Sequence, residues 1–505
     1  MNFELLKDLA QTLTRNKLKQ IEVLGNPGQE NSRSQLFFDG LLDDKFQSEE
    51  EIAQHFFGQA NAKDPNYRKL KNKVVRQMLN TVFFVDLNQP SFNERAKAYY
   101  ACYRDFAAAF VLLLRGSTKA GIYLLEQVLE QSIKYEFIEL IAEIARHLRT
   151  QTARSPTDQK QHQQYVALHR QYEEKRRLEM LALDYYEELV DYYLVRRSPN
   201  EEVKRLATAY FEELMPLAPQ ADTSRFYYYT YQIGIIKYFA ANDCHSVLSL
   251  IGKALPLLEI RKTTNRSMLQ AIVMQKLACL TQLRIFEEEA GENVADYSLS
   301  LSTDPDLNWF RTLESYFYYR TYQRNYIKAL HIFEKATKHA RFAQLEGSFK
   351  DNWLLLGGYL HLLAALGRLD SKQVESIVGP YRYGRLVNEV EIVDKDREGM
   401  NIPLLFLPIL LGLAQGNYAD YGGRSEEALE KYRQRYLDNS VNQRSAAFMN
   451  MLMALDKKAF DPISAERRIK KGLDTLQQEQ PQVIGQSFAI EIIPYEDLWT
   501  MLQEK

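Results

Sequence analysis

The sequence has few of the residues that interrupt secondary structure. It contains 22 Gly and 15 Pro, 37 in all among 505 residues. This share of about 7% is well under the roughly 12% of average usage. A many-stranded sandwich or barrel needs a turn about every ten residues, so those folds are excluded. Collagen-like and Pro/Gly-rich disordered chains are excluded as well.

Cysteine and net charge are also scarce. The three cysteines, Cys102, Cys244 and Cys279, lie far apart, which excludes a disulfide scaffold or a Cys-based zinc site. The 64 Lys and Arg nearly balance the 66 Asp and Glu, which leaves a formal charge of −2. This balance argues against a polyanion-binding protein whose whole surface is basic, although a local basic patch remains open.

Long apolar runs are missing too. The two longest, 402–414 and 353–366, fall short of the roughly 20 residues that span a bilayer. The first contains Pro403 and Pro408 and the second contains His361, so we interpret both as buried helices. The first residues, MNFELLKDLAQTL, have no apolar core of a signal peptide. We therefore expect no membrane association and a cytoplasmic location.

Helical periodicity is abundant. Leu70, Val74 and Met78 follow one another at intervals of four, and further segments show the same spacing. Longer polar breaks occur at 151–162, 287–308 and 394–401. We predict an all-α protein with a small helical N-terminal region at 1–95, helical repeats at 96–285, tetratricopeptide-like repeats at 286–380, and C-terminal repeats with a capping tail at 381–505.

One spacing of small and large residues recurs along the chain. Ala329, Phe333 and Ala336, at offsets 0, +4 and +7, place a small, a large and a small residue on one helix face. The same offsets occur at Val247/Ile251/Ala254, Ala182/Tyr186/Leu189, Ala207/Phe211/Leu214 and, more weakly, Gly121/Leu125/Val128. The first two copies lie 82 residues apart, close to two repeats of about 40. Hairpins of this kind bury their open face by stacking on a neighbour, which produces a solenoid.

These segments resemble the tetratricopeptide repeat (TPR) superfamily. Trp353, Leu356 and Gly357 match its first helix, with Leu360 in place of the usual Tyr, and the Ala329 segment matches its second helix. The resemblance implies a right-handed solenoid of degenerate repeats, with first-helix positions lining the inner face.

Residues 380–505 show a second resemblance, to a bacterial family of long TPR-like helical proteins. It rests on DKDREGMNIPLLFLPILLGL, RSEEALEKYRQRYLDN, RSAAFMNML and EIIPYEDLW. This resemblance implies a fold and no particular activity. Ile490, Ile492, Pro494 and Trp499 are typical of an extended tail that ends in a short amphipathic helix and caps the last hairpin.

Eight of the 32 tyrosines lie in two short segments, 226–231 and 316–322, each on a predicted first helix. Consecutive aromatic residues point around the whole helix, so they cannot all lie in one core stripe. The TPR resemblance places six candidates on the inner face: Tyr229, Gln232, Arg311, Glu314, Tyr318 and His361. Aromatic rings and a guanidinium group suit a peptide-binding groove. The alternative is ordinary helix–helix packing of the tyrosines with wet hydroxyls.

The N-terminal region carries a basic helix. Ser48 is a predicted N-cap with Glu51 at the capping-box position, and Asp64-Pro65 separates this helix from the next. Six basic residues follow between 63 and 76. Lys69, Lys73 and Arg76 share one face and could meet nucleic-acid phosphates, as in a helix-turn-helix. The alternative is a first solenoid hairpin with a solvated basic side.

Catalytic signatures are absent from the sequence. There is no GxxxxGK[ST], GxGxxG, HExxH, GxSxG or CxxC motif, and no two of the eight histidines lie four residues apart. Cys244 beside His245 is a conceivable nucleophile, but it falls where a small packing residue is normal. We expect no metal, no cofactor and no enzymatic activity.

The sequence therefore favours a non-catalytic protein-interaction scaffold that binds a peptide or partner protein in a concave helical groove. The alternative function is a nucleic-acid-binding transcriptional regulator with an N-terminal helix-turn-helix-like head. An enzyme with an unrecognised site is the third hypothesis. The sequence leaves the oligomeric state open.

Overall fold

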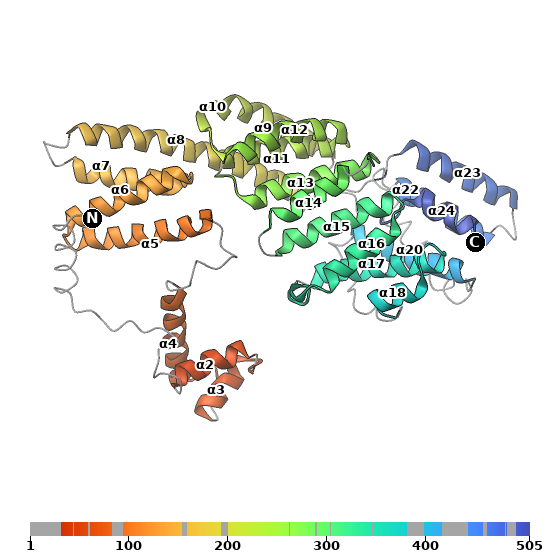
Figure 1. Ribbon diagram of the computed structural model, residues 1–505, viewed down its shortest axis with the longest axis horizontal. Helices are drawn as coiled ribbons and strands as arrows, with labels where there is room; N and C mark the ends of the chain where they lie inside the picture. The colour runs from red at the N-terminus through yellow and green to blue at the C-terminus, as the bar shows by residue number, and fades with distance from the viewer. Residues whose placement is uncertain are drawn as a thin grey trace. The chain divides into compact units, whose positions relative to one another are not determined.

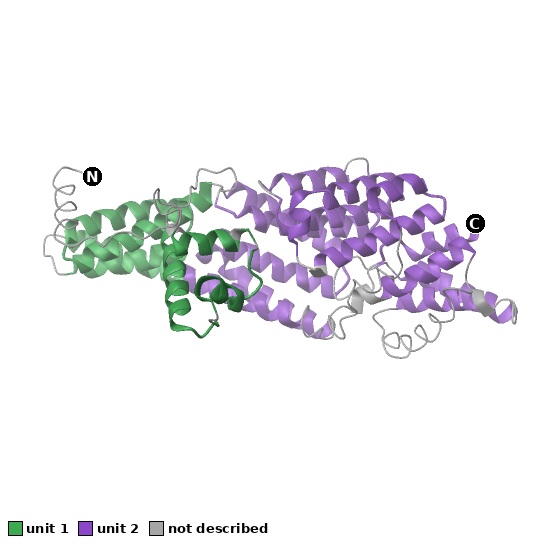
Figure 2. Cartoon of the chain, turned by 90° about the horizontal axis from the view of Figure 1, so that it is seen from below, with its two compact units in different colours: residues 1–174 green, residues 175–505 purple. Residues whose placement is uncertain are grey.

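The computed structural model describes residues 32–43, 45–58, 61–82, 94–153, 159–192, 200–261, 263–287, 290–302, 305–345, 347–380, 398–416, 443–457, 462–479, 481 and 491–505. Every regular element in these ranges is helical (Figure 1). The prediction of an all-α protein is confirmed for this part of the chain. The chain divides into two compact units, residues 1–174 and 175–505 (Figure 2). The four-part division made from the sequence stays a prediction.

The first unit contains two hydrophobic cores. Its helices are α2 (Arg33–Leu42), α3 (Glu49–Phe57), α4 (Pro65–Val82), α5 (Glu94–Leu114), α6 (Thr118–Lys134), α7 (Ile138–Thr152) and the first half of α8 (Gln159–Val190). One core lies among α2, α3 and α4 and includes Phe37, Ile52 and Tyr67. The other lies among α5 to α8 and includes Leu125 and Ile144.

Side-chain caps fix the ends of α3 and α4. The Ser48 hydroxyl accepts a hydrogen bond from the Glu51 amide at 3.2 Å, which confirms the predicted N-cap. The Glu51 carboxylate reaches back to the Gln47 amide rather than to that of Ser48. Gly58, at a φ of 73°, ends α3. The Asp64 carboxylate then accepts from the first amides of α4, which begins at Pro65.

The second unit is built mainly from pairs of consecutive helices. They are α9 (Asn200–Leu214), η3 (Met215–Leu217), α10 (Ala218–Ala221), α11 (Ser224–Ala240), α12 (Cys244–Ile260), α13 (Arg266–Gln282), α14 (Ala290–Ser300), α15 (Leu307–Tyr322), α16 (Tyr326–Thr337), η4 (Ala340–Gln344), α17 (Gly347–Ala365), α18 (Ser371–Val378), α20 (Glu398–Gln415), α22 (Gln443–Lys457), α23 (Pro462–Gln478) and α24 (Tyr495–Gln503). Helix α11 packs on α12, α13 on α14, α15 on α16 and α17 on α18. Further contacts join α12 to α13, α14 to α15 and α16 to α17, so each pair touches the next.

The turns inside these four pairs have a common geometry. Each contains one residue of positive φ: Asn242 (54°), Arg284 (55°), Arg324 (60°) and Gly367 (72°). Successive positions differ by 42, 40 and 43 residues, close to the repeat of about 40 expected from the sequence. The left-handed region lets the chain reverse at once after the first helix. Three of the four residues are not glycine, so a search for turn glycines would find only one.

The recurring 0, +4, +7 positions face the packed side of their helices. Ala329, Phe333 and Ala336 on α16 are all buried. A Cβ added at Gly357 on α17 would lie 3.2 Å from the Phe333 ring and 2.9 Å from Val378. The glycine of the Trp-Leu-Gly match thus permits close contact between α17 and the large residue of the preceding pair.

One predicted break is wrong. The segment 287–308 was expected to be a loop, but α14 occupies Ala290–Ser300 within it. Its buried residues are Gly291, Ala295 and Ser298, which are all small. Of the large apolar residues, only Val294 and Leu299 pack against the core, and both are partly buried, so the helical period is weak in a hydrophobicity pattern. The break at 394–401 is also too long, since α20 begins at Glu398.

The two long apolar runs lie in helices α17 and α20, as expected. Leu356 and Leu360 in α17 and Leu407 and Leu410 in α20 are fully buried in one shared core. Among the helices described here, none is long and apolar enough to cross a membrane. The runs are therefore explained by burial inside the second unit.

Candidate functional site

The six predicted inner-face residues occupy corresponding levels of their helices. Measured from the positive-φ turn residue of each pair, Tyr229 on α11 and Arg311 on α15 both lie 13 residues earlier. Gln232 and Glu314 lie 10 residues earlier on the same two helices. Tyr318 on α15 and His361 on α17 lie 6 residues earlier. The alignment made from the TPR resemblance is thus consistent with the turns of the structure.

Gln232 is hydrogen-bonded to the next first helix. The side-chain amide of Gln275, on α13, donates to the Gln232 carbonyl oxygen at 2.8 Å. Gln232 is only 2% exposed, and Oε1 of Gln275 has no hydrogen-bond partner in the described structure. A buried donor or acceptor left without a partner costs about 1–3 kcal/mol. This pair therefore has one acceptor without a partner, which a buried water could satisfy.

A second polar group joins α15 to α17. The Asn352 amide donates to the Glu314 carboxylate and lies 3.4 Å from the Tyr318 hydroxyl. The Tyr318 hydroxyl also donates to Glu314. Asn352 is 8% exposed, and its Oδ1 has no partner in the described structure. Reversing the amide would turn Oδ1 toward the carboxylate, so Glu314 itself fixes the orientation that leaves Oδ1 unpaired.

Burial changes the acidity of this group. It raises the pKa of Glu314 to about 7, against the opposing effects of Arg311, Tyr318 and Asn352. It also raises the pKa of Tyr318 well above 10, and the neighbouring Glu314 carboxylate adds to that increase. The tyrosine is therefore a permanent hydrogen-bond donor, whereas Glu314 changes charge near neutral pH.

The remaining predicted residues have different surroundings. Tyr229 is half-buried, with its ring 5.4 Å from Tyr186 of α8 and 5.3 Å from Tyr228. Arg311 is exposed. Half-buried His361 contacts the backbone oxygen of Gly379, 3.0 Å from Nε2, and burial lowers the pKa of this histidine.

The structure therefore sorts the candidates by exposure. It brings Arg311, Glu314 and Tyr318 together, while Gln232 pairs with Gln275 instead. The sequence predicted that Gln232 and Tyr318 line an open groove. In the structure they are only 2% and 5% exposed and do not line one. Their first-helix positions face neighbouring helices, because consecutive pairs approach closely there. The buried Gln232 and Tyr318 instead hold exposed or half-exposed neighbouring side chains in place.

Gln275 and Asn352 escaped the sequence reasoning. Helix α13, which carries Gln275, matches no repeat motif, because its pair includes the unrecognised α14. Asn352 directly precedes Trp353 of the Trp-Leu-Gly match. A search for polar residues next to that match could have found it.

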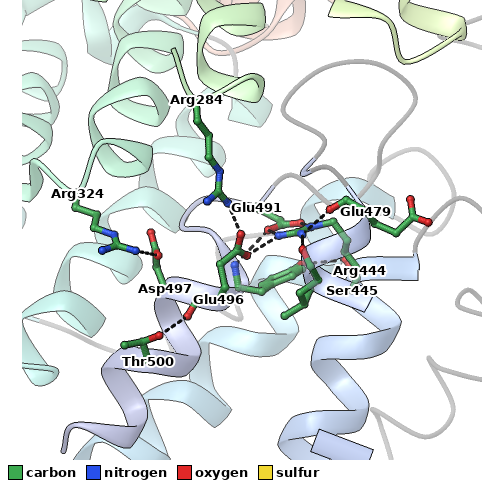
Figure 3. Close-up of polar contacts among 11 residues, drawn as sticks. Arg284, Arg324, Arg444, Ser445, Glu479, Glu491, Glu496, Asp497 and Thr500 are labelled. Atoms are coloured by element: carbon green, nitrogen blue, oxygen red, sulfur yellow. Dashed lines mark hydrogen bonds and ion pairs between the residues drawn. The ribbon is translucent and has the colours of Figure 1, made fainter. Parts of the chain in front are cut away.

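A buried ionic cluster holds the C-terminal segment (Figure 3). Arg444 of α22 is 6% exposed and bonds both carboxylate oxygens of Glu491, at 2.5 and 2.9 Å. It also bonds Glu496 of α24 at 2.6 Å and the backbone oxygen of Glu479 at 2.8 Å. Burial raises the pKa of Glu491, which Arg444 partly opposes. Burial also favours the neutral form of Glu496, but Arg444 and Arg284 hold its pKa below the ordinary value.

The turns of three consecutive helix pairs each supply an arginine to α24 or the residue after it. Arg284 pairs with Glu496, Arg324 pairs with Asp497 at 2.5 Å, and Arg368 pairs with Glu504. The predicted C-terminal amphipathic helix is confirmed, and Trp499 is buried. Helix α24 contacts α23 and also turns that lie far earlier in the sequence. It therefore does more than cap the last hairpin. Ile490 lies outside the described residues. The charged groups that hold α24 pair with one another, so we interpret them as structural rather than as a site.

The predicted nucleic-acid contacts lie on α4. Lys69, Lys73 and Arg76 are all exposed on the side of the helix away from buried Tyr67 and Val74. They are on one face, as the spacing predicted.

Two of the three cysteines lie against each other between α12 and α13. Cys244 is buried at the start of α12 and bonds the buried Cys279 of α13, which lowers the pKa of the Cys244 thiol. A substrate cannot reach either sulfur. In the described ranges, no group of three or more His, Cys, Asp and Glu side chains could hold a metal ion. No family model matches the chain, and comparison with curated proteins and with solved structures finds no similar protein.

Proposed function

We propose that the chain is a non-catalytic interaction scaffold, in which the second unit forms a degenerate TPR-like solenoid. Three features support the solenoid: contacts between successive helix pairs, turns that recur after 42, 40 and 43 residues, and the contact of Gly357 with Phe333. In such an array the first helices share one face, which is the usual surface for a partner.

The observation that carries the function is a set of buried polar atoms without partners on those first helices. Gln275 and Asn352 each keep an unpaired acceptor beside side chains that are wholly or partly exposed. These buried atoms are out of reach of a partner, which would instead contact the accessible side chains beside them, Tyr229 and Arg311. We call Tyr229, Gln232, Gln275, Arg311, Glu314 and Asn352 the polar row.

We also propose that the scaffold works in the cytoplasm. The three cysteines are free and buried, which agrees with a compartment that keeps thiols reduced. The partner is a protein or peptide, with no cofactor required.

Affinity purification with the full chain tests the role of the polar row. Tyr229 and Arg311 are the members to change, because they are accessible, whereas replacing buried Tyr318 would disturb packing. We expect the double variant Tyr229→Ala/Arg311→Glu to lose a partner that the wild type retains. The matched control, Lys253→Glu/His331→Ala, changes exposed residues on the second helices α12 and α16 and should keep that partner. Equal partner sets for wild type and both variants would refute the binding surface.

A further inference from the structure

Helices α2, α3 and α4 form a small body with its own hydrophobic core. Phe37, Ile52, Ala53, Tyr67 and Val74 are buried in it. The Tyr67 hydroxyl donates to Glu49 of α3 at 3.3 Å, so α3 and α4 are also joined by a polar contact. These contacts and the Asp64 cap fix which side of α4 faces the core.

The opposite side of α4 is basic. Four exposed cations lie on it within nine residues: Arg68, Lys69, Lys73 and Arg76. At 1.5 Å per residue they extend over about 12 Å of helix. The exposed amide of Asn72 lies among them, and the sequence from Pro65 to Val82 contains no acidic residue.

The cations on this side are not neutralised by the described protein. Lys71, the remaining basic residue of α4, is paired with Glu49 at 2.5 Å. By contrast, Arg68, Lys69, Lys73 and Arg76 form no ion pair with a described residue. Lys69 and Lys73 are also one helical turn apart, and like charges at that spacing destabilise a helix by about 0.2–0.5 kcal/mol. An external anion would remove this repulsion.

The geometry favours duplex DNA over a lipid surface. A helix that binds a membrane interface must insert its apolar face into the bilayer. The apolar face of α4, with Tyr67 and Val74, is already packed in the core with α2 and α3, while Val75 and Leu79 lie outside this face and are exposed. A single exposed helix preceded by a shorter helix and a turn fits the major groove, which is about 12 Å wide.

We propose that α4 is a DNA-binding helix, separate from the polar row of the second unit. Arg68, Lys69, Lys73 and Arg76 contact backbone phosphates, and Asn72 faces the base edges, where an asparagine amide can pair with adenine. Because phosphate contacts release counterions, four of them give a slope of log K against log salt of about −3.6.

Fluorescence anisotropy with the full chain and a labelled 30-base-pair duplex tests this site. We expect wild-type binding at about 50 mM salt, with the slope stated above. The variant Lys69→Glu/Lys73→Glu/Arg76→Glu should bind at least about tenfold more weakly, with a slope reduced to about −0.9. Lys69→Gln/Lys73→Gln/Arg76→Gln should show the same direction of change without adding negative charge.

The matched control makes the same change of charge elsewhere. Arg467, Lys470 and Lys471 are exposed on α23, and their joint replacement by Glu should leave DNA binding unchanged. Circular dichroism of each variant confirms folding. Failure of the wild type to bind at 50 mM salt would overturn the proposal, as would an equal loss in the α23 control. Binding to phosphatidylserine vesicles but not to the duplex would also overturn it.

Discussion

At the scale of single residues, Glu314 is the side chain whose charge depends on the fold. Burial raises its pKa from 4.5 to about 7, so the folded protein holds a proton on this carboxyl between those values while the unfolded chain releases it. The free energy of unfolding therefore falls as the pH rises from about 4.5 to 7, because the unfolded state binds fewer protons. At pH 7 the carboxyl of the folded protein is about half ionised, and the loss is nearly complete about one pH unit higher.

The variant Glu314→Gln removes this titration. It should gain stability relative to the wild type at pH 8, and the gain should be smaller at pH 5. Urea unfolding of both proteins across that range measures the difference. A difference that does not change with pH would show that Glu314 has an ordinary pKa.

Arg444 gives a second prediction at the residue scale. Its replacement by Met leaves Glu491, which is 2% exposed, as a buried charge without its cation, with the Tyr495 amide still donating to it. We expect a loss of about 3–5 kcal/mol in the free energy of unfolding. The double variant Arg444→Met/Glu491→Leu should recover much of that loss, because neither charge is then buried alone.

Arg324 is the matched control for this cluster. It is 68% exposed in its pair with Asp497, so Arg324→Ala should cost no more than about 1 kcal/mol. Denaturant unfolding of the three variants under one condition separates the cases. Equal losses for Arg444→Met and Arg324→Ala would contradict the assignment of Arg444 as the central group.

At the scale of elements, α14 shows how close packing of small residues builds a helix pair. A Cβ added at Gly291 would overlap the ring of Tyr319, which is buried on α15. Gly291→Ala should therefore destabilise the protein by about 1–3 kcal/mol. Thermal unfolding measures this change.

Gly252 on α12 provides the comparison. No atom lies within 4 Å of a Cβ added there, so Gly252→Ala gains helix propensity without a clash. It should stabilise the protein by about 0.5–1 kcal/mol. If both alanine variants raise the melting temperature, the close approach of α14 and α15 is wrong.

The same helix marks where the sequence could be interpreted and where it could not. The face of α16 was predictable, because Phe333 is flanked by Ala329 and Ala336 at helical spacing. The face of α14 was not, because its packing depends on the absence of side-chain volume at Gly291 and Ala295. Hydrophobic periodicity detects large residues, and it gives no signal where the large partner belongs to another helix.

At the scale of the whole molecule, the low content of Gly and Pro excluded turn-rich folds, and the helical periodicity then predicted an all-α chain. Contacts between distant residues were not predictable. The Thr321 hydroxyl donates to the backbone oxygen of Ile492 at 2.8 Å, across 171 positions, and Arg284 meets Glu496 across 212. No local pattern in the sequence encodes such pairings. They depend on the distance between successive helix pairs in the folded unit.

The candidate site, like the fold, was predictable within single helices but not between them. Arg311 and Tyr229 were found because motif positions can be counted along a helix. The burial of Gln232 and Tyr318, and the roles of Gln275 and Asn352, depend on the distance between neighbouring first helices. That distance is a property of the folded unit and is not encoded in any one segment.

The central claim is that the polar row on the first helices is the surface that meets a partner. Site-specific photocrosslinking in cells tests it most directly, with a benzoylphenylalanine placed at position 229 or 311 and, as controls, at position 253 or 331 on the second helices. We predict that positions 229 and 311 crosslink to the same protein and that the two controls do not. Crosslinks to that protein from the controls alone, or from no position, would contradict the claim.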